Sequence, residues 1–241
     1  MNRFLEVVMK NVVKILMVMA ALLVLGAGQV WAYPISSGET VYLNERSTGG
    51  PYGTYGGGDF GVSTTSNGDV LFNTFCLELG VFMDFNTPYT VSSIADYVEV
   101  KSSPNRNISD GTKYLFWHFN QETLGGFSSV NFNPSNQDDV RALQLAIWTL
   151  EGYGIGSGTN QISQDLITGV QSTYDSLLAL VAGVEIDESQ MNVKVMNLMS
   201  GNTYVQSQLI AGASPVPEPG TLLLLGSGLA GLALYRRRVS K

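Results

Sequence analysis

The stretch Phe75-Cys76-Leu77-Glu78-Leu79 decides how the fold is interpreted, because it combines a strand pattern with the only cysteine of the chain. Apolar side chains at every second position predict a β-strand over residues 70–79, with Cys76 and Glu78 on the opposite face. A single thiol has no internal disulfide partner. Cys76 is therefore either an inert buried or unpaired side chain, or a group that reacts with another part of the protein.

The patterns around this strand predict an α+β fold. Further strands are expected where short apolar runs are bounded by turn residues, at 40–43, 81–85, 89–91, 191–199 and 203–210. Helices are expected where apolar residues recur with helical spacing, from about 109 to 119, from Ser135 to 150 and over 162–181. A Gly-rich run at 48–61 predicts a surface loop. The first and last strands would share a β-sandwich or barrel-like sheet, and the helices would form an inserted subdomain.

The composition excludes several functional classes. Between Tyr33 and Val216 there are 18 acidic and 6 basic side chains, a net charge of −12. Nucleic-acid binding needs clusters of Lys and Arg, so we expect no nucleic-acid partner. The chain has one histidine, no Gly-x-Ser-x-Gly motif and no cluster of His and Cys. We therefore expect no metal, no cofactor and no catalytic residues of an enzyme.

The N-terminus has the three parts of a secretory signal peptide. Basic residues lie within positions 1–14, an uncharged apolar run covers 15–28, and Val30-Trp31-Ala32 places small residues before a cleavage point. We predict a signal peptide over 1–32, cleaved after Ala32, and an exported domain over 33–212. The alternative is an uncleaved membrane anchor, although the apolar run is shorter than a full span.

The C-terminus, residues 213–241, contains Pro217-Glu218-Pro219, an apolar run at 222–235, and Arg236-Arg237-Arg238. The prolines break the chain before a helix, and the arginines hold its far end in the cytoplasm. This tail resembles the PEP-CTERM sorting signal of Gram-negative bacteria. The resemblance implies a transmembrane helix that holds the protein in the inner membrane transiently, cleavage by an exosortase-type protease, and release to the cell surface or an exopolysaccharide matrix.

A second polar residue lies within an otherwise apolar helix. Between residues 140 and 150, only Arg141, Gln144 and Thr149 are polar, which predicts a helix buried on most sides. Gln144 lies on the face with Val140 and Ile147. A buried carboxamide without partners costs on the order of 1–3 kcal/mol, so Gln144 is either a hydrogen-bonded core glutamine or a reacted one.

The run Phe-Cys-Leu-Glu on a strand, followed by Leu-Gln-Leu-Ala-Ile-Trp at 143–148 on a helix, resembles the thioester domain of bacterial surface adhesins. This resemblance implies an internal thioester between Cys76 and Gln144. Trp148 and Trp117 would then shield the bond from water. His118 and Glu78 are candidates for proton transfer, with a structural histidine and a solvated carboxylate as the alternatives.

These observations predict an exported surface or matrix protein, an adhesin that captures amine-bearing partners covalently through its thioester. Such a reaction occurs once per molecule, so the protein would not be an enzyme. The alternative is a structural surface protein that binds polysaccharide or matrix noncovalently and is sorted by an exosortase.

Overall fold

The computed structural model describes residues 32–45, 58–99, 104–158, 160–187 and 191–213. They belong to one compact unit that spans Ala32–Ser214. The predicted signal peptide and the sorting tail lie outside the described residues. In the described part of the chain, no helix has both the length and the apolar character needed to cross a membrane.

The unit contains a seven-stranded antiparallel sheet with the strand order β3-β2-β1-β4-β7-β8, in which β9 also pairs with β7. A second sheet pairs β5 (Tyr97–Val98) with β6 (Arg106–Asn107). The strands of the main sheet come from both ends of the unit: β1 (Thr40–Glu45), β2 (Phe60–Ser63), β3 (Phe72–Thr74), β4 (Pro88–Ala95), β7 (Val193–Ser200), β8 (Thr203–Tyr204) and β9 (Gln208–Ala211). The first and last strands, β1 and β9, share this sheet as predicted, and β4 pairs with β7 with a register shift between Val91 and Ser93.

A short bridge connects the segment after β3 with β9. Directly after β3, the carbonyl of Phe75 accepts the Leu209 N–H at 3.1 Å, and the Leu77 N–H donates to the carbonyl of Ser207 at 3.1 Å. Cys76 therefore lies opposite Gln208 in an isolated antiparallel bridge. The sheet curls far enough for the segment after its first strand to meet β9.

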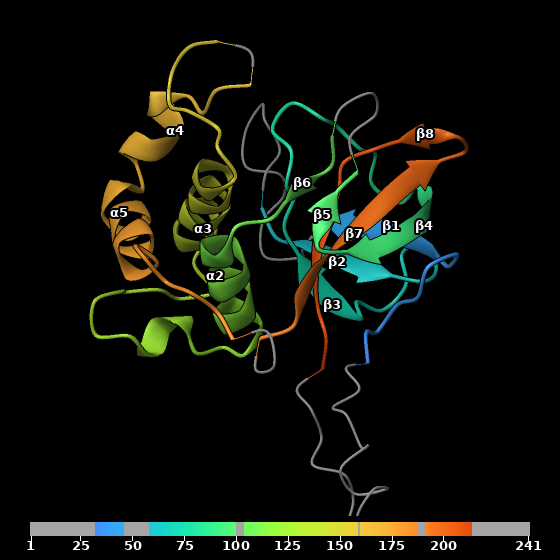
Figure 1. Ribbon diagram of the computed structural model, residues 1–241, viewed down its shortest axis with the longest axis horizontal. Helices are drawn as coiled ribbons and strands as arrows, with labels where there is room; N and C mark the ends of the chain where they lie inside the picture. The colour runs from blue at the N-terminus through green and yellow to red at the C-terminus, as the bar shows by residue number, and fades with distance from the viewer. Residues whose placement is uncertain (1–31, 46–57, 100–103, 159, 188–190, 214–241) are drawn as a thin grey trace, which may run out of the picture. The chain divides into compact units, whose positions relative to one another are not determined.

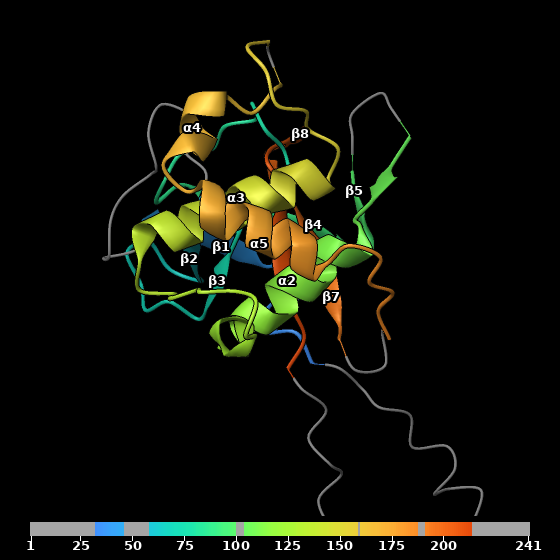
Figure 2. The ribbon, with the colours of Figure 1, turned by 90° about the vertical axis from the view of Figure 1, so that its left-hand side faces the viewer.

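The helices lie together on one side of the sheet (Figures 1 and 2). They follow one another between β6 and β7: α2 (Asp110–Asn120), the 3-10 helix η2 (Leu124–Gly126), α3 (Gln137–Leu150), α4 (Gln164–Thr168) and α5 (Gln171–Leu180). Helix α5 is outermost, and α3 lies between it and the sheet. The α+β prediction, with helices inserted between strands, is confirmed.

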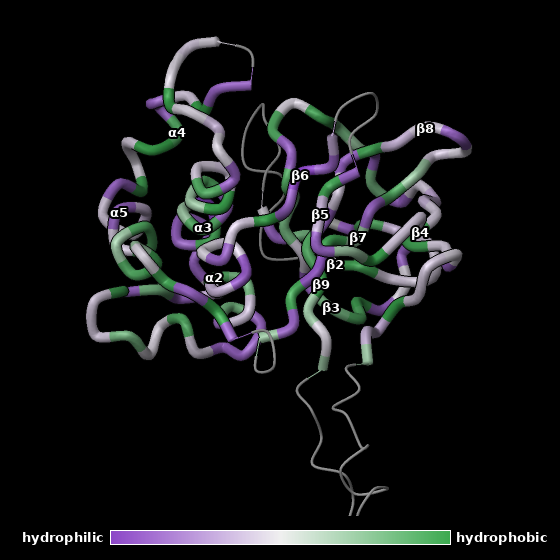
Figure 3. Tube along the Cα trace, in the orientation of Figure 1, coloured by the Kyte–Doolittle hydropathy of each residue, from purple (hydrophilic) through white to green (hydrophobic). Residues whose placement is uncertain are grey.

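The helices bury apolar faces against the sheet and against each other. The ring of Phe75 packs edge-on against Phe116 at 6.3 Å and Phe119 at 4.9 Å, between ring centroids. Hydrophobic and hydrophilic residues alternate along α2, α3 and α5 (Figure 3), as expected for helices with one buried side. In α3 the burial is wider, because every residue from Ala142 to Trp148 is buried.

Several predicted boundaries are wrong. The strand predicted at 70–79 is regular only over Phe72–Thr74, because Val70 and Leu71 are about half exposed. Residues 81–85 form no strand, since the Asp84 N–H donates to the Tyr89 hydroxyl at 2.7 Å instead of to a neighbouring strand. The surface loop predicted over 48–61 extends too far, because residues 60 and 61 belong to β2.

Two helix predictions also need correction. The helix predicted over 162–181 is two helices, which separate at Gly169, a residue with low helix propensity. Helix α3 begins after Asn136 and not after Ser135. The Asn136 side chain accepts the Asp138 N–H at 2.8 Å, so Asn136 is the N-cap.

Candidate functional site

Cys76 and Gln144, 68 positions apart in the sequence, are in direct contact. The Cys76 thiol donates to Gln144 Oε1 across 3.3 Å, and Gln144 Nε2 donates to the Cys76 carbonyl at 2.9 Å. A carbonyl carbon lies about 1.23 Å from its oxygen, so the sulfur is within about 4.5 Å of the carboxamide carbon. Both residues are buried, with exposed fractions of 0% and 1%.

The pair is held together by the backbone of Cys76, whose N–H and carbonyl lie at an edge of the sheet. In the bridge with Gln208, the N–H and carbonyl of Cys76 do not pair with β9. Both groups instead bind the carboxamide of Gln144, which occupies the position of a neighbouring strand. Gln144 reaches this edge because it lies in the middle of α3, on the side that faces the sheet.

The oxygen of Gln144 is surrounded by backbone donors. The N–H groups of Cys76 and Gly58 donate to Oε1 at 3.2 and 3.3 Å. Two backbone N–H groups directed at one carbonyl oxygen polarise the carbonyl and stabilise negative charge that develops on this oxygen during attack. The arrangement has the form of an oxyanion hole.

Burial keeps the thiol protonated. It raises the pKa of Cys76 far above the usual range, and the negative charge of Glu78 raises it further. The Cys76 backbone, the Trp148 indole and the Gly58 backbone lower this pKa, but by less. Attack by this sulfur must therefore be coupled to the loss of its proton.

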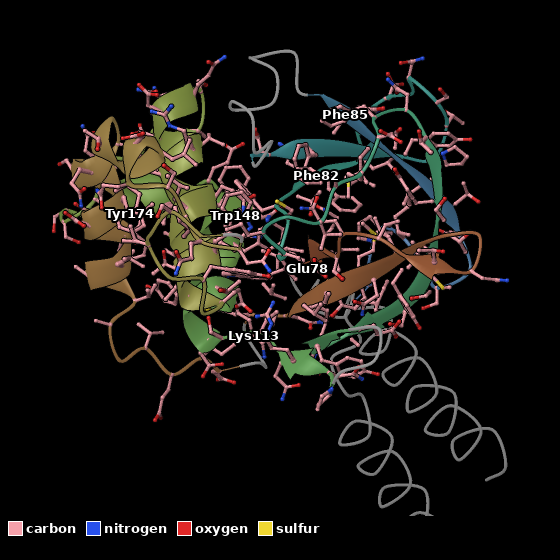
Figure 4. All side chains as sticks on the ribbon, turned by 90° about the horizontal axis from the view of Figure 1, so that it is seen from above. Glu78, Phe82, Phe85, Lys113, Trp148 and Tyr174 are labelled. Atoms are coloured by element: carbon pink, nitrogen blue, oxygen red, sulfur yellow. The ribbon has the colours of Figure 1, made fainter. Side chains whose placement is uncertain are left out.

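Trp148 lies one helical turn after Gln144 on α3, with its indole N–H near the Cys76 sulfur. Its side chain is 2% exposed, and Figure 4 shows it at the boundary between the helices and the strands, with Glu78 on the strand side. The indole Nε1 makes no hydrogen bond of normal geometry within the described residues, although its N–H lowers the pKa of the Cys76 thiol. A donor near the sulfur and a buried ring fit the predicted shielding position.

Glu78 is not a plain solvated carboxylate. It is half-buried, and burial raises its pKa to about 7, against the effect of hydrogen bonds from the Ser207 N–H at 2.7 Å and the Ser207 hydroxyl at 3.1 Å. The charge of Arg106 also lowers this pKa. A carboxyl that titrates near neutral pH, two residues from the thiol, can accept or donate a proton under physiological conditions.

The structure does not bring His118 to the pair. Its Nδ1 lies 2.7 Å from the Thr123 hydroxyl, and its ring stacks against Tyr114 and Phe127. Burial lowers the pKa of His118, and no hydrogen bond among the described residues connects it with Cys76 or Gln144. Trp117 is buried in α2, next to the Phe116 ring that packs against Phe75.

Two residues of the site could not be recognised from any sequence pattern. Gly58 donates to Gln144 from the end of a run that was predicted to be a surface loop. Gln208 lies opposite Cys76 because of the bridge to β9, which links positions 132 residues apart. In the described ranges, no group of three His, Cys, Asp or Glu side chains could hold a metal ion.

Comparison with known proteins is informative only for the tail. The family model of the PEP-CTERM protein-sorting motif matches residues 215–238. The comparison with curated proteins and the comparison with solved structures each gave no significant match. The chain thus carries at its C-terminus a PEP-CTERM sorting motif, which marks an exported protein that an exosortase processes for the cell surface or the extracellular space.

Proposed function

We propose that Cys76 and Gln144 form an internal thioester, with which the exported protein captures amine-bearing partners covalently. The observation that supports this proposal is the buried contact of 3.3 Å between the Cys76 sulfur and Gln144 Oε1, the same oxygen that two backbone N–H groups polarise. A hydrogen-bonded core glutamine would use the same backbone donors, but it would not need a thiol against its carboxamide oxygen.

The bond forms by exchange at the carboxamide carbon. The Cys76 sulfur attacks this carbon, the oxygen takes up negative charge between the N–H groups of Cys76 and Gly58, and the C–N bond breaks. The thiol proton passes to the departing nitrogen, which leaves as ammonia. Glu78, two residues from Cys76 and with a pKa that burial raises to about 7, is the candidate to carry this proton.

Capture of an amine is a second exchange at the same carbon, in which the sulfur is the leaving group. A primary amine attacks the thioester carbon, the C–S bond breaks, and one amine proton passes to the sulfur. The product is an amide at Gln144 and a free thiol at Cys76. Because each molecule reacts once, this is adhesion and not catalysis, and the amines would belong to a surface or an exopolysaccharide matrix that the exported protein meets.

Intact mass spectrometry of the exported protein tests the proposal. We expect a mass lower by one ammonia than that of the processed sequence, and resistance to thiol alkylation. Methylamine should add its own mass and release a thiol that can be alkylated. Cys76→Ala and Gln144→Leu should each prevent the loss of ammonia, whereas His118→Gln, at a residue outside the site, should not. An unmodified mass with a thiol that is alkylated after unfolding would refute the thioester.

The noncovalent alternative makes a different prediction. Phe82 is 67% exposed and Tyr204 is 39% exposed, and such rings can stack on sugars. Binding of exopolysaccharide would then be unchanged in Cys76→Ala and reduced in Phe82→Ala. A binding assay with both variants distinguishes the two functions.

A further inference from the structure

The side chain next to Cys76 on the face of its sulfur belongs to Gln208. The two residues oppose each other in a pair whose hydrogen bonds are made by their neighbours, from Leu209 to Phe75 and from Leu77 to Ser207. In this type of antiparallel pair, the Cα atoms are about 4.5 Å apart and both side chains point to the same face. The amide of Gln208 therefore lies beside the thiol.

The oxygen of this amide has no partner in the described part of the chain. Gln208 is 0% exposed, and its Oε1 accepts no hydrogen bond there. Its Nε2 donates to Gln206 Oε1 at 3.4 Å and lies 3.9 Å from the Met83 sulfur. Exchanging the oxygen and nitrogen of the Gln208 amide would place its oxygen against Gln206 Oε1, so these contacts fix the orientation of the amide. A buried acceptor without a donor destabilises a fold, so stability does not explain it.

We propose that Gln208 Oε1 accepts an N–H from the incoming amine and thereby selects primary amines over secondary amines. This inference rests on the proposed thioester. A primary amine has two N–H groups, one for Gln208 during attack and one whose proton passes to the sulfur as the C–S bond breaks and the C–N bond forms. A secondary amine has one N–H and cannot supply both.

A flexible residue, in contact with the amide nitrogen, lies between Gln208 and the surface. Met83 contacts Gln208 and is itself half-buried, so Gln208 is one side chain away from the surface. The unbranched thioether of Met adopts many conformations at low cost. Displacement of this side chain would expose Gln208 to a small amine without unfolding the sheet.

Two variants separate the role of the acceptor from that of the side-chain volume. Gln208→Met keeps the length but removes the acceptor, whereas Gln208→Glu keeps acceptor oxygens. Intact mass spectrometry first establishes that each exported protein has lost ammonia. The protein is then mixed with methylamine or dimethylamine, and adduct formation is followed by mass spectrometry. We expect Gln208→Met to react with methylamine about tenfold more slowly than the wild type, and to discriminate less between the two amines. Gln208→Glu should keep the wild-type rate and the wild-type preference for methylamine.

The melting temperature distinguishes this role from a purely structural one, because loss of a structural glutamine would lower it. Because Gln208→Met removes an unpaired buried acceptor, its melting temperature should equal or exceed that of the wild type. A wild-type protein that captures methylamine and dimethylamine at equal rates would overturn the selection, even if Gln208→Met failed to fold. Unchanged capture in a Gln208→Met protein that has lost ammonia would overturn it as well. If the wild-type protein keeps its ammonia, the thioester itself is refuted, and the inference with it.

Discussion

Replacing Glu78 by Gln should change how the stability of the folded unit depends on pH. The carboxyl is half-buried, and burial raises its pKa from the ordinary 4.5 to about 7. A carboxyl with a higher pKa in the folded state keeps its proton longer there than in the unfolded chain. The stability that it contributes is therefore full below pH 4.5 and is lost as the pH rises through 7.

The size of this effect on the free energy of unfolding follows from the difference between the two pKa values of Glu78. A separation from 4.5 to 7 corresponds to about 3 kcal/mol of unfolding free energy. We take this value as a ceiling, because the side chain retains contact with solvent. Gln has nearly the same shape and its oxygen can still accept the Ser207 N–H, which lies 2.7 Å from the carboxylate. The variant should therefore match the wild type near pH 4 and exceed it above about pH 7.

Urea unfolding of the two proteins at a series of pH values measures this difference. All other titratable groups are shared, so the difference between the two curves reports Glu78. The exposed Glu122→Gln variant controls for the loss of one negative charge. Parallel pH profiles for wild type and Glu78→Gln would refute the reasoning, and so would a variant that loses stability relative to wild type as the pH rises.

Four further predictions have defined outcomes. Asn136→Ala should lower the unfolding free energy by about 1 kcal/mol through loss of the α3 cap, whereas Ser135→Ala should change it by less than about 0.5 kcal/mol. Glu151→Ala should lower the unfolding free energy by roughly 1–3 kcal/mol in urea unfolding, because it removes the buried carboxylate that accepts from the Ser109 N–H and the Thr112 hydroxyl. Gln144→Glu should lower the melting temperature at neutral pH, since it buries a carboxylate beside a carbonyl oxygen. Glu218→Ala should leave the C-terminal tail attached, which an immunoblot of cell fractions shows as a larger, membrane-bound species.

The helices were largely predictable from the sequence, because their signals are local. Ser109 accepts the Thr112 N–H and starts α2 where the sequence indicated, and the apolar run around Gln144 gave the wide burial of α3. The strands were less predictable. Residues 81–85 have a strand-like composition, but a hydrogen bond to the Tyr89 hydroxyl replaces strand pairing there.

The site was predictable only where a residue type is rare. A lone cysteine and a carboxamide within the apolar run 140–150 are exceptional in the sequence, so both could be singled out. Gly58 and Gln208 could not, because one is among 27 glycines and the other is an ordinary polar residue near a turn. Their roles depend on the close approach of β2, β9 and α3, and no local pattern encodes that approach.

The hydrogen bonds around Gln144 distinguish between the possible products of the proposed thioester. Its oxygen has two backbone donors whether the carbon carries nitrogen or sulfur, but the bond from Nε2 to the Cys76 carbonyl, 2.9 Å long, is lost when ammonia leaves. Capture of a primary amine gives an amide whose remaining N–H can donate to that carbonyl again. Hydrolysis instead gives a carboxylate, 1% exposed at this position, with an oxygen facing the Cys76 carbonyl. Because a buried carboxylate with one oxygen against a carbonyl is more costly than a fully hydrogen-bonded amide, we expect the proposed thioester to favour aminolysis over hydrolysis.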